Sequence, residues 1–72
     1  MRLKDVLTRL SGGAVITSRQ DTFYLCDGNS AAVRLDNETV VKLANEQYVT
    51  EYDGNYVLTT KGQSKLTRLN RR

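Results

Sequence analysis

Histidine is absent from this chain of 72 residues, and cysteine occurs only once, as Cys26. Without histidine, neither a His-dependent catalytic triad nor a zinc cluster can be assembled. A single cysteine cannot form an internal disulfide, and no cationic neighbour in sequence would activate its thiol, so a buried, inert thiol is expected. The default setting is therefore the reducing cytoplasm.

Proline is also absent, so no proline marks a linker, and the longest apolar run is the four residues 23–26. A bilayer-spanning helix needs about 20 apolar residues, and the N-terminus has no apolar stretch typical of a signal peptide. We expect one soluble, unexported domain over residues 1–72. The acceptor motif for glycosylation at residues 37–39 then occurs by chance.

The charges are unevenly distributed, although the net charge is only +3. Residues 1–20 carry four cations and one acid, and residues 61–72 carry five cations and no acid. Residues 21–60 carry two cations and seven acids. The basic ends favour a nucleic acid as partner, whereas the acidic middle favours a protein.

The first half of the chain predicts a helix followed by three short strands. Residues 14–18 and 22–26 have strand-like composition, and residues 31–35 alternate enough for a third strand. Asp27-Gly28-Asn29 is a turn signal between them. The helix is predicted before Gly12-Gly13, because apolar residues recur on one helical face at Leu3, Val6, Leu7 and Leu10.

The second half predicts a helix, a β-hairpin and a closing helix. Asp36 or Asn37 can cap a helix over residues 37–47. Residues 48–52 and 56–59 are typical of strands around an Asp53-Gly54-Asn55 turn. The side chains that the first of these helices is expected to turn inward are Val40, Leu43 and Ala44.

The closing helix is expected to begin near Thr60, which would cap it, with Gln63 completing a capping box. It should bury Leu66 and Leu69. Together these elements predict an α+β fold, a small winged-helix-like domain with the order α-β-β-β-α-β-β-α.

Residues 30–35 allow a rival interpretation. Ser30 can cap a short helix, which would make residues 39–47 the second helix of a helix-turn-helix. Such a short first helix is marginal without tertiary contacts, so the strand is favoured. In both interpretations the later helix is followed directly by the hairpin.

Apolar residues and turn glycines recur along almost the whole chain in a recognisable pattern. The pattern comprises Leu7-x-x-Leu10-x-Gly12-Gly13 with Ile16, Asp27-Gly28, Val40-x-x-Leu43, Tyr48-Val49 and Gly54-Asn55-Tyr56-x-Leu58-Thr59-x-x-Gly62. In this the chain resembles small bacterial winged-helix-like proteins, including the YjhX-type toxin family. The resemblance implies the fold and a DNA-linked role, either as a regulator or as an inhibitor of a DNA-handling enzyme. It implies no particular functional residue.

In winged-helix proteins that bind DNA, the helix before the hairpin enters the major groove. The side chains then expected at base edges or phosphates are Asn37, Thr39, Lys42 and Asn45. Acids on the same helix and at the hairpin tip would repel phosphate. The alternative interpretation is an ordinary polar face in solvent.

The last segment carries cations at helical spacing, so one stripe of the closing helix could face a phosphate backbone. Its members are Lys61, Lys65 and Arg68, followed by Arg71 and Arg72. The alternative is a solvated helix end whose cations complement the helix dipole.

Four tyrosines could stack on unpaired bases, namely Tyr24, Tyr48, Tyr52 and Tyr56. A cross-strand pair of Tyr52 with Tyr56 is the favoured interpretation for those two, because aromatic pairs stabilise sheets directly.

No spacing of carboxylates pairs a general acid with a base, and no phosphate-binding glycine loop is present. We therefore expect a non-enzymatic binding protein without a cofactor, favouring a DNA-binding regulator. The alternative is a protein-binding inhibitor or adaptor, such as a phage- or plasmid-encoded antagonist of a host complex. Its contacts would be Glu51, Tyr52 and Asp53.

The size of the chain adds an expectation about assembly. A core built from 72 residues is marginal without a staple. Pairing would bury more surface, and the first helix is strongly amphipathic. The sequence therefore predicts a homodimer through residues 2–10.

Overall fold

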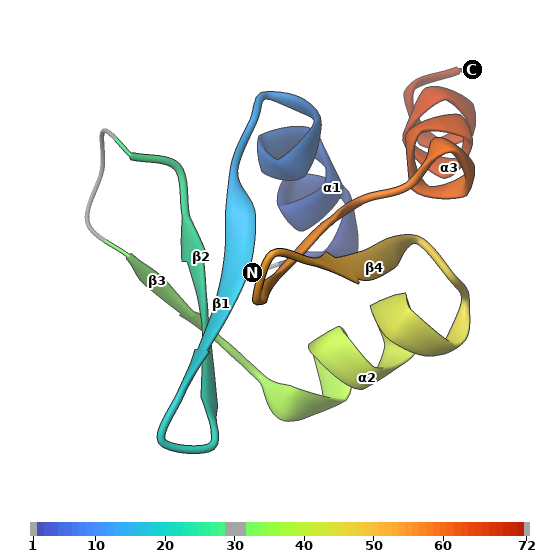
Figure 1. Ribbon diagram of the computed structural model, residues 1–72. Helices are drawn as coiled ribbons and strands as arrows, with labels where there is room; N and C mark the ends of the chain where they lie inside the picture. The colour runs from blue at the N-terminus through green and yellow to red at the C-terminus, as the bar shows by residue number, and fades with distance from the viewer. Residues whose placement is uncertain (1, 29–31, 72) are drawn as a thin grey trace.

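The computed structural model describes residues 2–28 and 32–71 (Figure 1). Within them the chain forms an α+β domain with three helices and a five-stranded antiparallel sheet, so the predicted class is confirmed. The strand order is β3-β2-β1-β5-β4. The elements are α1 (Leu3–Ser11), β1 (Val15–Arg19), β2 (Thr22–Cys26), β3 (Val33–Leu35), α2 (Asn37–Asn45), β4 (Val49–Tyr52), β5 (Asn55–Leu58) and α3 (Thr60–Asn70).

The helices cover one face of the sheet, and the hydrophobic core lies between them and the strands. Ile16, Leu25 and Leu35 are buried there from β1, β2 and β3. Phe23 and Tyr56 pack against the core edge to face, with ring centroids 6.1 Å apart and planes at 68°, a favourable aromatic geometry. The buried residues contributed by the helices are Val6, Leu7 and Leu10 of α1, Val40 and Leu43 of α2, and Leu66 of α3.

The ends of α1 and α2 share one hydrogen-bonded motif. After α1, the Gly13 and Ala14 amides donate to the carbonyls of Leu10 and Arg9, both at 3.1 Å. After α2, the Gln47 amide donates to the Ala44 carbonyl at 3.0 Å, and the Tyr48 amide to the Leu43 carbonyl at 2.9 Å. Both are Schellman motifs, which require a left-handed residue.

Gly13 fills the left-handed position after α1, with φ 107°, but Gln47 fills it after α2, with φ 62°. A left-handed residue cannot continue a right-handed helix. The helix predicted over residues 37–47 therefore ends two residues earlier, at Asn45.

Thr59, not Thr60, caps α3, so the predicted cap was wrong by one residue. The Thr59 hydroxyl oxygen accepts a hydrogen bond from the Gly62 amide at 3.0 Å and donates to the Gln47 carbonyl at 2.6 Å. Gln63 therefore does not occupy the capping-box position. Its side-chain oxygen instead accepts a hydrogen bond from the Ser11 hydroxyl at 2.8 Å, which joins α3 to α1.

Gly62 lets α3 approach the backbone that follows α2. A Cβ at this position would collide with the Tyr48 carbonyl and lie 2.6 Å from a methyl carbon of Leu58. The Thr59 amide also donates to the same Tyr48 carbonyl at 2.9 Å. The Leu58-Thr59-x-x-Gly62 signature thus docks the last helix onto the rest of the fold.

The strand interpretation of the segment before α2 is confirmed for Val33–Leu35, where β3 pairs with β2. The rival short helix was therefore wrong at these residues, because their backbone groups are used in the sheet. Asn29, Ser30 and Ala31, which belonged to the predicted turn, cap and strand, lie outside the described residues.

Four predicted side-chain positions were wrong. Cys26, expected to be buried, is only partly buried and lines a hollow on the outer face of the sheet. Ala44 is exposed on α2, and Leu69 is 36% exposed on α3, because each lies at the border of its helix's buried stripe. Tyr52 does not pair with Tyr56. The two-residue Asp53-Gly54 turn, with φ 54° and 83°, sets a register in which Tyr52 stands opposite Asn55.

Candidate nucleic-acid interface

The exposed side of α2 brings together three of the four residues of this helix that were predicted to contact DNA. Asn37, Lys42 and Asn45 line one shallow hollow of about 400 Å³ along this helix. Val41 lies among them and is 53% exposed. At 100° per residue, Val41, Lys42 and Asn45 fall on the side opposite the buried Val40 and Leu43, and Asn37 lies at the edge of that side. The face can therefore reach a groove or another surface.

The fourth predicted residue, Thr39, is half-buried on the flank of α2. Glu38 and Glu46 also line the hollow on the exposed side. Glu38 lies one helical turn before Lys42, so its negative charge offsets the positive charge of Lys42 on this face. The α2 face carries hydrogen-bonding groups but no excess of positive charge.

The cationic stripe of α3 lies on one side of that helix. Lys61 and Arg68 are exposed and Lys65 is half-buried. Gln63, which bonds to Ser11 of α1, lies about 160° around the helix from Lys61 at 100° per residue. The stripe therefore points away from α1. No acidic residue occurs within Thr60–Asn70.

The two predicted DNA-contacting groups are not adjacent. Figure 1 shows α2 and α3 on opposite sides of β4. Arg71 is exposed just after α3, and Arg72 lies outside the described residues. A ligand that contacts both helices must therefore extend past the β4–β5 hairpin.

The tip of the β4–β5 hairpin carries the residues predicted for the alternative protein contact. Tyr52 is 70% exposed there, and its neighbours Glu51 and Asp53 are exposed too. The tip thus exposes one aromatic ring, with an acid on either side of it in the sequence.

The residues of α1 that motivated the homodimer prediction are used in the monomer. Val6 and Leu7 are 0% exposed and Leu10 is 4% exposed. The exposed residues of α1 are polar or charged: Lys4, Asp5, Thr8, Arg9 and Ser11. The dimer stays a prediction, and an interface on this helix would have to be polar.

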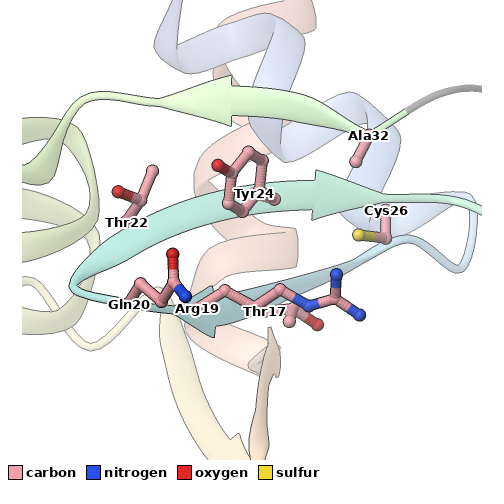
Figure 2. A pocket seen from close by; sticks show the side chains of 7 residues that line it. All are labelled: Thr17, Arg19, Gln20, Thr22, Tyr24, Cys26 and Ala32. Atoms are coloured by element: carbon pink, nitrogen blue, oxygen red, sulfur yellow. The ribbon is translucent and has the colours of Figure 1, made fainter.

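The face of the sheet away from the helices was not predicted as a site, although it carries a basic and aromatic surface. Thr17 and Arg19 of β1 and Thr22 and Tyr24 of β2 line a hollow of about 740 Å³ on it (Figure 2). In the register of the sheet, Tyr24 stands opposite Arg34 of β3. We call these five residues the open sheet face.

The open sheet face could have been found in the sequence only through the strand register. Arg19 and Thr22 pair directly around a two-residue turn, Gln20-Asp21, in which both residues have positive φ. The sequence suggested a three-residue connection beginning at Arg19. A shift of one residue turns every side chain of a strand to the other face.

The described residues were also considered as a metal site and as a membrane-spanning segment. No group of three or more His, Cys, Asp or Glu side chains there could hold a metal ion. No helix among them is long and apolar enough to cross a membrane.

Comparison with known proteins gives no relative for this chain. No family model matches it, nor does any curated protein or any solved structure at a significant level.

Proposed function

We propose that this protein binds nucleic acid without transforming it, and that it acts on duplex DNA as a regulator. The observation that carries the proposal is the cationic stripe of α3, formed by Lys61, Lys65 and Arg68 in a helix without acids. Cations aligned on one face, with no acid between them, release counterions when they contact phosphates, which gives affinity for any duplex.

We further propose a winged-helix-like mode of binding, in which α2 enters the major groove and the β4–β5 hairpin serves as the wing. Support comes from the chain order, because the hairpin follows α2 directly. Asn37 and Asn45 can each hydrogen-bond an adenine edge, and Lys42 a guanine. All three line the exposed side of α2.

The test of the α3 stripe compares two sets of charge-neutralising variants in a salt titration of duplex binding. Replacing Lys61, Lys65 and Arg68 with Gln should weaken binding to every sequence and lower the log-log salt slope by up to about 3. The matched control replaces Lys4 and Arg9, exposed cations of α1, with Gln. This control should retain most of the slope.

Duplex binding that is insensitive to salt, or absent at low ionic strength, would count against the proposal. So would an α1 control that lowers the slope as much as the α3 variant, because net charge rather than the stripe would then explain the affinity.

The role of α2 is tested separately, on a preferred sequence selected from a random duplex pool. Asn37→Ala, Lys42→Ala and Asn45→Ala should each cost about 1–3 kcal/mol on that sequence and little on unrelated duplexes. Thr39→Ala is predicted to act in the same direction, but less, because its side chain is half-buried. Equal losses on all sequences would remove α2 from base recognition.

A second candidate function is supported by the exposed Tyr52 at the hairpin tip. Exposed aromatic side chains often anchor protein interfaces, and the flanking Glu51 and Asp53 would steer a basic partner. One substitution distinguishes the two functions. Glu51→Lys should strengthen duplex binding if the hairpin lies beside phosphates, but a protein antagonist of a host complex would lose association rate with its target.

A further inference from the structure

The open sheet face combines an aromatic ring with two cations on adjacent strands. Its central aromatic ring is Tyr24, which is half-buried and stands opposite Thr17 on one side and Arg34 on the other. Directly opposed residues on a sheet have Cβ atoms about 5 Å apart. Arg19 stands opposite Thr22 and is therefore the diagonal neighbour of Tyr24. A cation thus lies on each side of one ring.

The cations of the open sheet face are not used by the fold. Neither Arg19 nor Arg34 forms an ion pair within the part of the chain that the structure describes. Both side chains are exposed, and Figure 2 shows Arg19 on the same side of the strands as Tyr24. The outward side chains of β1, β2 and β3 include no acid. The charge of the face therefore favours an anionic ligand.

The same row of side chains continues across the sheet. The Thr17 hydroxyl donates to the Asn55 side-chain oxygen at 2.8 Å, and Asn55 stands opposite Tyr52. From β3 to β4, this outward row consists of Arg34, Tyr24, Thr17, Asn55 and Tyr52. An arginine and a tyrosine thus stand at its two ends, and hydrogen-bonding side chains lie between them. Such a surface offers room for more than one nucleotide.

We propose that the open sheet face binds single-stranded nucleic acid, with a base stacked on Tyr24 and neighbouring phosphates held by Arg19 and Arg34. Aromatic rings on a sheet stack bases of any sequence, whereas the ring faces of a duplex are hidden inside the base stack. This surface shares no residue with the α2 face or the α3 stripe. The proposal therefore goes beyond duplex binding and does not depend on it.

Acids near one end of the face set the direction of the bound strand. Three acids, Asp21, Asp36 and Glu38, line a neighbouring hollow together with Arg34, close to the β1–β2 turn. These acids repel phosphates beyond Arg34, so the bound strand extends from Tyr24 toward Thr17 and Asn55 rather than past the turn. Asp21→Asn removes one of these acids and should strengthen single-strand binding while the backbone is retained, since asparagine tolerates the left-handed conformation.

The test measures binding of a fluorescein-labelled oligothymidylate of about 12 nucleotides, a length in the range of one such site, by anisotropy at several salt concentrations. Tyr24→Ala should weaken binding about 5- to 150-fold, whereas Tyr24→Phe keeps the ring and should stay within about twofold. Arg19→Gln with Arg34→Gln should lower the salt slope by about 1.4. Circular dichroism verifies that each variant is folded.

The matched control is Arg9→Gln, which removes an exposed cation from α1 and should change the slope little. The proposal is overturned if the oligothymidylate does not bind at low ionic strength, or if Tyr24→Ala binds it as the native chain does. It is also overturned if neutralising the α3 stripe abolishes single-strand binding that Tyr24→Ala leaves intact. Loss of duplex binding alone overturns the function proposed above and leaves this one standing.

Discussion

The side chains of the two sheet faces alternate along the same strands, yet only one face packs against the helices and contributes to the core. Phe23 and Tyr24 are consecutive in β2, yet Phe23 packs against Tyr56 at the core, and Tyr24 lies in the hollow of the open sheet face. One ring contributes to stability through burial, whereas the other remains available to a ligand.

The difference separates the residues that the stability of this small domain requires from those that it does not require. The covered face needs apolar side chains, because a core of this size is marginal. Nothing in the fold requires two arginines and a tyrosine on the other face, since neither arginine has an ion-pair partner among the described residues. Substitutions on the two faces should therefore separate stability from binding.

The largest expected effect is in the core, where α2 packs over the covered face of the sheet. Leu43 is 0% exposed, so Leu43→Ala should lower the free energy of unfolding by about 2–5 kcal/mol through lost burial and a residual cavity. Val41→Ala, two residues earlier on the exposed side of the same helix, is the control and should stay within about 0.5 kcal/mol. Urea unfolding followed by circular dichroism measures both. Similar losses at the two positions would contradict the assigned orientation of α2.

The next effect concerns the contact that holds α3 in place. Gly62→Ala should cost about 1–3 kcal/mol, because its Cβ would collide with the Tyr48 carbonyl and force α3 away from β5. Ser64→Ala, at an exposed position of the same helix, should instead stabilise by up to about 0.5 kcal/mol through helix propensity. Thermal melts of the two variants that shift in the same direction would show that α3 docks more loosely than the structure indicates.

Features set by local sequence were the ones predicted well. The heptad-like spacing of Leu3, Val6, Leu7 and Leu10 placed α1 to within one residue. The second hairpin was found because Asp53-Gly54 is a typical left-handed turn. These signals act over a few residues, so one sequence is enough to show them.

Two kinds of feature were missed: those in which a residue departs from its usual conformational preference or one of two equivalent residues is used, and those that depend on strand pairing. Gln47 ends α2 in a conformation that glycine usually adopts, and either of two adjacent threonines could have capped α3. The open sheet face depends on the register of β1 with β2 and of β2 with β3. Its continuation depends on β5, which lies nearly 40 residues from β1, as the Thr17–Asn55 bond shows. The alternation of apolar and polar residues assigns the two sides of a strand only when the bounds and pairing of that strand are known.

A smaller effect, in the stabilising direction, is expected at the turn beside the open sheet face. Gln20 and Asp21 have φ 48° and 64°, the conformation that Asp53 and Gly54 adopt in the other hairpin. Gln20→Asn with Asp21→Gly supplies the residues this turn prefers and should raise the free energy of unfolding by about 0.5–1 kcal/mol. The reciprocal change, Gly54→Asp, should destabilise by a similar amount. A destabilised Asn-Gly variant would mean that the native turn residues make contacts needed by the fold.

The smallest effect on stability is expected for the two arginines of the open sheet face. It would show that this face, unlike the covered one, contributes little to the stability of the fold. Arg19→Gln with Arg34→Gln removes two exposed cations that form no ion pair among the described residues, so the free energy of unfolding should change by no more than about 0.5 kcal/mol. The difference in urea midpoint between this variant and the native chain should be small at both low and high salt, since no ion pair within residues 2–28 and 32–71 is lost. A loss above about 1 kcal/mol would mean that the arginines support the sheet. With stability unchanged, any loss of oligonucleotide binding by this variant can be assigned to the ligand contact itself, because the folded population is the same.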